Sequence, residues 1–399
     1  MTRHLLLLAP LALAACATTE PVATSPDSIV ERDGSGAMAL FPILDREAGP
    51  KENIVYSPAS VDQAFGLLRL GAAGSTAEQL DRVLPAPRNA DYLRVDKDDV
   101  EVRIANALFL SDAFRFRQSF VSSAKSRYDA TTQAVDFLTP APTAKTINDW
   151  AEKATEGLIP QVITPGSITP DMVAVLANAL YFDGRWETKL THGDIRAFLF
   201  GDGSEKPFRF VGKVLSLNKV EADGWSAVRI PYANDRYTMD VIIPEKRRVM
   251  AEAPSPEMIE ELGAKLAGEK HQLVDLLIPQ FEVDYSTGLI PALQALGVTA
   301  PFEKGVADLS PMAEPGQAPL VVSDARHVTK LQVFDAGTRA AAVTTISIVV
   351  TSGAIYEKEP VPFIADRPFV IVIRDLEARE VLFVGRIASP EAFEPEVIE

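Results

Sequence analysis

The sequence predicts an α+β fold from three observations. The first half contains segments with helix caps and helical spacing of apolar residues, the second half contains apolar runs of strand length, and a hairpin pattern lies near the end. Helices that precede a group of strands are typical of α+β domains, whereas regular alternation would indicate an α/β fold. With 47% hydrophobic and 24% charged residues, the 399-residue chain has the composition of a globular protein.

The first residues resemble a bacterial export signal. Arg3 supplies positive charge, residues 5–13 are apolar, and small residues precede Cys16, the single cysteine. The apolar run is too short to span a bilayer. Leu-Ala-Ala-Cys resembles a lipobox, so we expect residues 1–15 to be removed and Cys16 to carry the lipid. The alternative is ordinary secretion, with cleavage nearby and an incidental thiol.

The segment after the cysteine predicts a tether and then one domain. Residues 16–36 are rich in Thr, Pro, Ser, Asp and Gly, which suits a flexible linker. Ala17 and Thr18 lack the acidic residue associated with inner-membrane retention. We therefore expect an outer-membrane lipoprotein facing the periplasm or the cell surface, or otherwise a secreted protein. Residues 37–390 contain no repeat or second linker and predict one continuous domain, followed by a tail at 391–399. We expect the protein to be a monomer.

Cap and stop residues predict three helices in the first half. Ser57 is a cap candidate before a proline, and Gly71 is suited to end the same helix. Ser75 or Thr76 is the expected cap of the next helix. We expect helices over residues 58–70, 75–84 and 143–156.

Apolar runs predict the strands. Residues 172–182 are long and nearly uncharged, as expected of a central strand buried on both faces. The last two runs flank Asp375-Leu376-Glu377-Ala378 and predict a final hairpin. We expect strands over residues 102–110, 172–182, 227–230, 237–243, 273–279, 369–374 and 381–385.

Charge and motif content exclude several classes of function. The formal net charge of −16 disfavours binding to nucleic acid or to anionic lipid headgroups. One cysteine excludes a disulfide framework and a cysteine-based zinc site. The sequence lacks a Gly-x-Ser-x-Gly elbow, a His-Glu-x-x-His motif and a phosphate-binding glycine loop. We therefore expect neither an enzyme nor a metal or cofactor.

Residues 335–353 form an unusual stretch. As an extended strand without proline from 337 to 351, the stretch would reach about 50 Å, which exceeds ordinary strands. One face of this strand would carry only small or apolar side chains, namely Thr338, Ala340, Ala342, Thr344, Ile346, Ile348 and Val350. The opposite face carries the charge of Arg339. Taken by itself, the stretch is equally compatible with a long core strand or with a helix through the alanines.

Sequence landmarks in a fixed order decide between these alternatives. They lie at residues 53–60, 176–186, 230–232, 239–244, 278–281, 296–310, 337–342 and 365–370. Together they resemble the serpin family over almost all of residues 37–390. The resemblance implies an N-terminal helical part packed on a large mixed central sheet, smaller sheets, and an exposed reactive-centre loop at about 335–368. It also implies an irreversible suicide inhibitor of serine proteases, whose cleaved loop inserts into the main sheet.

The resemblance further implies roles for three groups of residues, none of them catalytic. The hinge of the loop consists of Gly337, Thr338, Arg339, Ala340, Ala341, Ala342, Val343 and Thr344. The shutter, which latches the sheet below, consists of Ser57, Ser60, Asn178 and His327. Counting the family's spacing from the hinge places the cleaved reactive bond between Thr351 and Ser352.

Small and β-branched residues before that bond suggest an elastase-like or subtilisin-like target protease. Because the segment that follows is long for the family, cleavage at Tyr356 or Lys358 stays an alternative, which would favour a chymotrypsin-like or trypsin-like enzyme. The rival functions are a non-inhibitory serpin-fold binding protein, whose hinge would usually carry bulky or charged inward residues, and a structural lipoprotein.

Overall fold

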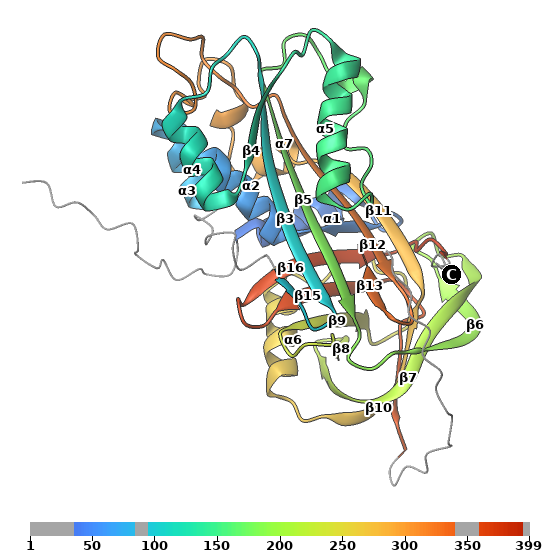
Figure 1. Cartoon of the computed structure of the whole chain (residues 1–399). Coiled ribbons are helices and arrows are strands. Elements are labelled where there is room, and N and C mark those ends of the chain that lie inside the picture. Colours follow the sequence, from blue (N-terminus) through green and yellow to red (C-terminus); the bar gives the residue numbers. More distant parts are fainter. Residues whose placement is uncertain (1–35, 84–94, 340–358, 394–399) are drawn as a thin grey trace, which may run out of the picture. The chain divides into compact units, whose positions relative to one another are not determined.

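Two sheets form the framework of this protein, whose computed structural model describes residues 36–83, 95–339 and 359–393 (Figure 1). Within these residues, a seven-stranded sheet has the order β11-β12-β13-β5-β3-β2, with β4 added beside β3. A nine-stranded sheet has the order β1-β16-β15-β9-β8-β7-β10-β14, with β6 added beside β7. The smaller sheets expected from the resemblance are thus joined into one through the long strand β7.

The strands of each sheet come from distant parts of the chain. The seven-stranded sheet consists of β2 (Val95–Lys97), β3 (Val100–Ser111), β4 (Thr131–Val135), β5 (Ala174–Arg185), β11 (Phe281–Gly288), β12 (Asp324–Val333) and β13 (Gly337–Arg339). The nine-stranded sheet consists of β1 (Ile54–Tyr56), β6 (Thr191–Leu199), β7 (Glu205–Ala222), β8 (Trp225–Pro231), β9 (Tyr237–Pro244), β10 (Gln272–Pro279), β14 (Val361–Ile364), β15 (Phe369–Asp375) and β16 (Glu380–Ile387).

Helices cover the seven-stranded sheet and one end of the other. The α-helices are α1 (Phe41–Ala48), α2 (Pro58–Leu70), α3 (Gly74–Val83), α4 (Gln118–Tyr128), α5 (Pro140–Ala154), α6 (Pro256–Gly268) and α7 (Ile290–Ala295). Short 3-10 helices lie at Gly36–Leu40, Pro165–Ser167 and Ala300–Phe302. The predicted α+β class is confirmed, but the expected order of helices first and sheets later is wrong, because β1, β3 and β4 lie among the early helices and α6 and α7 among the late strands.

Local signals placed α2 correctly and α3 to within one residue at each end, but the predicted cap of α3 is wrong. The Ser57 hydroxyl accepts a hydrogen bond from the Ser60 amide, and α2 ends at Leu70 before Gly71, as predicted. Helix α3 begins at Gly74, so Ser75 and Thr76 are not its caps. The Thr76 hydroxyl instead accepts from the Asp308 amide at 2.9 Å, a tertiary contact that the local sequence does not reveal. The predicted helix 143–156 starts three residues earlier than expected, at a proline.

The core alternates across the strands of the seven-stranded sheet. On β3, Leu108 and Leu110 pack toward α2, whereas Ala107 and Phe109 pack toward α5 on the opposite face. Figure 1 shows α5 beside the upper part of β5, running along the sheet. Farther along the same strands, residues such as Phe182 pack against the nine-stranded sheet. Strands β3 and β5 are therefore buried over most of their length, and any strand added beside β5 joins a buried layer.

Candidate functional site

Strand β13 lies between β12 and β5 at one end of the seven-stranded sheet (Figure 1). Thr338 pairs with Val333 of β12 on one side and with Gly184 of β5 on the other, antiparallel to both. Toward the opposite end, β12 and β5 pair directly and in parallel, through Asp324–His327 and Val175–Asn178. The first residues of the predicted hinge therefore already occupy the start of an additional central strand.

The side chains of β13 fit this position closely. Thr338 is fully buried, and its hydroxyl lies 2.8 Å from the hydroxyl of Tyr232. A Cβ atom at Gly337 would come within 2.2 Å of the Gly184 carbonyl oxygen, so only glycine is compatible with this backbone approach. Burial thus explains the small side chain of Thr338, and the close approach of β5 explains the glycine at position 337.

A tryptophan secures the turn between β12 and β13. The Trp186 indole donates a hydrogen bond to the Phe334 carbonyl oxygen at 2.9 Å, and its ring stacks on Tyr232 with centroids 4.6 Å apart. Lys189 forms a 3.1 Å ion pair with Asp335 in the same turn. The sequence analysis placed Trp186 and Tyr232 within family landmarks but did not assign them to the site. Their aromatic side chains within those landmarks were the feature that could have identified them.

The structure brings three of the four predicted shutter residues into one chain of hydrogen bonds. The Ser57 amide donates to Nε2 of His327 at 3.0 Å, and the Ser57 hydroxyl accepts from the Ser60 amide at 3.0 Å. Asn178 pairs with His327 in the β5–β12 register and lines the same small cavity of about 10 Å3. Within the described residues, Ser60 Oγ and Asn178 Oδ1 have no hydrogen-bond partner, so both can accept new bonds if the strands separate.

Asn106 extends this cluster and was missed at the sequence level. Asn178 donates its side-chain amide to Asn106 Oδ1 at 2.7 Å, and Asn106 donates in turn to the Tyr128 carbonyl oxygen at 3.2 Å. Asn106 is only 1% exposed. A lone amide within the otherwise apolar predicted strand 102–110 was the signal that could have identified it.

The buried His327 makes stability depend on pH. Burial lowers its pKa from an ordinary value of 6.5 to about 4. Between these values the unfolded chain binds a proton that the folded protein does not, so stability is retained above pH 6.5 and falls as the pH decreases toward 4. The expected loss in the free energy of unfolding approaches about 3 kcal/mol at the acid end of this range.

Denaturant titrations at about pH 7.5 and about pH 4.5, on the native protein and on a His327→Gln variant, measure this effect. The variant should lose clearly less stability than the native protein on acidification, because it cannot take up that proton. Equal losses in the two proteins would assign the acid sensitivity to other groups.

Several predicted site residues lie outside the described residues. These are Cys16, Ala340, Ala341, Ala342, Val343, Thr344, Thr351 and Ser352, together with the alternative cleavage positions Tyr356 and Lys358. Their roles stay predictions. Over the described ranges, the structure brings together no group of three His, Cys, Asp or Glu residues that could hold a metal ion.

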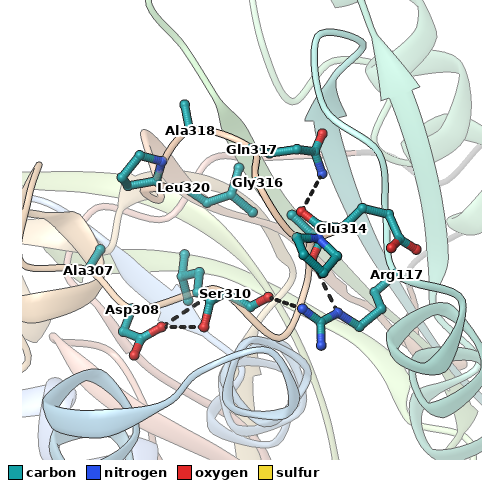
Figure 2. A pocket seen from close by; sticks show the side chains of 13 residues that line it. Arg117, Ala307, Asp308, Ser310, Glu314, Gly316, Gln317, Ala318 and Leu320 are labelled. Atoms are coloured by element: carbon teal, nitrogen blue, oxygen red, sulfur yellow. Dashed lines mark hydrogen bonds between the residues drawn. The ribbon is translucent and has the colours of Figure 1, made fainter.

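A surface pocket of about 290 Å3 lies beside the segment 307–320 (Figure 2), and no predicted hinge or shutter residue lines it. Figure 2 shows the Arg117 guanidinium pointing at this segment, where it donates to the carbonyl oxygens of Ala313 and Ser310 at 3.2 and 3.3 Å. The Ser310 hydroxyl bonds to Asp308 at 2.7 Å. These polar groups bind one another, so we assign the pocket a supporting role for the segment rather than a ligand.

Comparison with known families identifies the family of the fold described above. A family model described as "Serpin (serine protease inhibitor)" matches residues 34–390. The chain belongs to the serpin family. The description of this family associates it with the inhibition of serine proteases.

Relatives of this serpin occur in distant organisms. An uncharacterized serpin-like protein of Methanosarcina mazei is 28% identical over 380 residues, which cover 91% of this chain and 88% of that protein. Antithrombin-III of Ovis aries is 29% identical over 378 residues, which cover 89% of this chain and 80% of that protein.

Solved structures agree with the serpin fold. The native state of the thermophilic serpin tengpin matches with a TM-score of 0.78 at 23% identity, covering 92% of this chain and 96% of that one. A structure of human thyroxine-binding globulin matches with a TM-score of 0.78 at 21% identity, covering 90% and 98% of the two chains. At these identities, the structural likeness establishes the fold alone.

Proposed function

We propose that this serpin traps serine proteases by a cleavable loop that inserts into the seven-stranded sheet. The supporting observation is the position of β13, because a strand that continues from Arg339 between β12 and β5 would complete that sheet. Side chains alternate along a strand, so Ala340, Ala342 and Thr344 would share the inward face on which Thr338 is buried. All are small enough for a closely packed layer and carry no charge.

The proposed trapping step follows ordinary serine protease chemistry. The serine hydroxyl of the protease attacks the carbonyl carbon of Thr351, and the proton passes through the protease histidine to the departing amine of Ser352. The Thr351–Ser352 peptide bond breaks, and an ester joins Thr351 to the protease. Insertion of the loop would carry the ester to the far end of the sheet before water attacks it. Inhibition therefore depends on insertion being faster than hydrolysis of the ester.

The preferred target is a protease with a shallow, apolar specificity pocket. Val349 and Val350 precede the proposed bond, and small or β-branched side chains suit elastase-like or subtilisin-like enzymes. No additional cofactor is required by this mechanism.

Incubation with a panel of serine proteases tests the proposal. We expect an SDS-stable complex with an elastase-like or a subtilisin-like protease, and mass spectrometry of the released C-terminal peptide should show Ser352 as its first residue. A released peptide that begins directly after Tyr356 or Lys358 would show that the reactive bond follows that residue instead. Absence of any stable complex across the panel would instead indicate a non-inhibitory serpin or a structural lipoprotein.

We also propose that the chain is an exported lipoprotein tethered through Cys16. The support is the signal-like segment of residues 1–15 and the polar linker that follows it. Within the described part of the chain, no helix is both long and apolar enough to cross a bilayer. A Cys16→Ser variant should move from the membrane fraction to the soluble fraction, and an unchanged distribution would contradict lipid anchoring.

A further inference from the structure

The chain returns to the seven-stranded sheet after its last strand. The Glu282 amide donates to the Glu391 carbonyl oxygen at 3.0 Å, and the Glu391 amide donates to the Glu282 carbonyl oxygen at 3.3 Å. These two bonds form an isolated antiparallel bridge at the start of β11. Because β11 is an edge strand, Glu391 covers the beginning of an otherwise open edge.

The residues just before this bridge are fixed to the nine-stranded sheet. The Asn53 side-chain oxygen accepts from the amides of Ala388 and Ser389 at 2.9 and 2.8 Å. The Asn53 side-chain amide donates to the Ser389 carbonyl oxygen at 2.7 Å. Asn53 directly precedes β1, so the C-terminal segment leaves from a rigid attachment point and does not need to be held by β11 alone.

Phe393 then contacts the turn that leads into the hinge. Its ring meets Phe334 edge-to-face, with centroids 6.1 Å apart and an interplanar angle of 83°. Its carbonyl oxygen accepts from the Gln280 side chain at 2.9 Å, and Gln280 is only 2% exposed. Phe393 is thus held by a ring contact and by a buried donor.

Phe334 connects this contact to the hinge. Its carbonyl oxygen accepts from the Trp186 indole, and Trp186 stacks on Tyr232, which contacts the Thr338 hydroxyl. The Phe334 amide also donates to the Gly337 carbonyl oxygen at 3.0 Å, and the turn is bonded to the chain after β5 because Trp186 and Leu190 donate their amides to carbonyl oxygens of the turn. Separation of β12 and its turn from β5 would break these last two bonds. A group that holds Phe334 therefore resists opening at this end.

We propose that residues 391–393 form a C-terminal clasp that holds the turn at Phe334 and slows opening of the sheet between β12 and β5. Its consequence for inhibition rests on the proposed function, since a faster opening would change the rate of loop insertion. The clasp itself is a property of the intact fold and is measurable without a protease.

Two chain ends provide a matched comparison. One variant ends at Pro390 and lacks the clasp, and its control ends at Phe393 and lacks only the residues beyond it. A Phe393→Ala variant of the full chain removes the ring alone. The amides of Trp186 and Leu190 donate to the carbonyl oxygens of Ala336 and Asp335 in the turn, so their hydrogen exchange reports its opening.

Exchange at these two amides should be about threefold to tenfold faster in the chain ending at Pro390 and in Phe393→Ala than in the native protein, because an edge-to-face aromatic pair is lost. The chain ending at Phe393 should match the native protein. Equal exchange in all four proteins would overturn the clasp. Loss of protease complexes in every variant and in the native protein would reject the inhibitor function, while the exchange rates would still decide on the clasp.

Discussion

A Thr338→Arg variant is expected to be cleaved by its target protease without trapping it. Thr338 is fully buried between β12 and β5, where its hydroxyl contacts Tyr232. A guanidinium group in that position would be buried without a counter-charge, at a cost of several kcal/mol. Insertion would therefore stall while cleavage of the distant reactive bond continues. We expect the fraction of protease captured as SDS-stable complex to fall by about tenfold or more.

A Thr338→Ser variant is the matched control for this substitution. It keeps the hydroxyl that faces Tyr232 and adds no volume or charge, so its stoichiometry of inhibition should stay near that of the native protein. Undiminished complex formation by Thr338→Arg would show that the hinge does not have to enter the sheet. Resistance of Thr338→Arg to cleavage would show a changed loop rather than a failed insertion.

Cleavage of the loop is expected to raise the melting temperature by about 20 °C. A strand that continues from β13 would add roughly a dozen ladder hydrogen bonds, each contributing about 1 kcal/mol. In a domain of this size, each kcal/mol shifts the melting temperature by about 2 °C. Calorimetry of the native protein before and after limited proteolysis in the loop measures this rise directly.

The same proteolysis of Thr338→Arg provides the control. Its loop is cut but should not insert, so its melting temperature should change by only a few degrees. A native protein that becomes no more stable after cleavage would contradict both insertion and the inhibitor function. An equal rise in the two proteins would mean that stabilisation does not depend on the inward face at Thr338.

Local patterns predicted the elements whose ends are decided by neighbouring residues. The Ser57 cap and Gly71 fixed α2, and the uncharged run at 172–182 identified β5 as a strand buried on both faces. Strand β7 and helices α4 and α6 were not predicted. In β7 the burial pattern alternates irregularly over 18 residues, because successive segments of this strand pair with different neighbours, first β6, then β10 and finally β8. No single periodicity describes such a strand.

The candidate site likewise has features that the sequence predicted and features that only the structure revealed. A period of two predicted that Thr338 and every second residue after it share one face of small or apolar side chains, and the resemblance implied a role for them as a hinge. Neither source indicated that β13 is already paired with β12 and β5, or that Asn178 bonds to Asn106 rather than to a neighbour in the chain. The contacts of Asn178 with Asn106 and of β13 with β5 join residues more than 70 positions apart. Only the pairing of β13 with β12 is local, because a short turn connects these two strands.

The sequence by itself determined the family and predicted the hinge residues, because both are encoded in the order of small, polar and apolar side chains. Only the tertiary structure decided that Thr338 is seated against Tyr232, that burial lowers the pKa of His327 to about 4, and that Phe393 contacts Phe334. The physical reason is that burial and pairing depend on which distant surfaces meet. The pKa of a side chain and its hydrogen-bond partners depend on this tertiary environment and not on the neighbouring residues in the sequence.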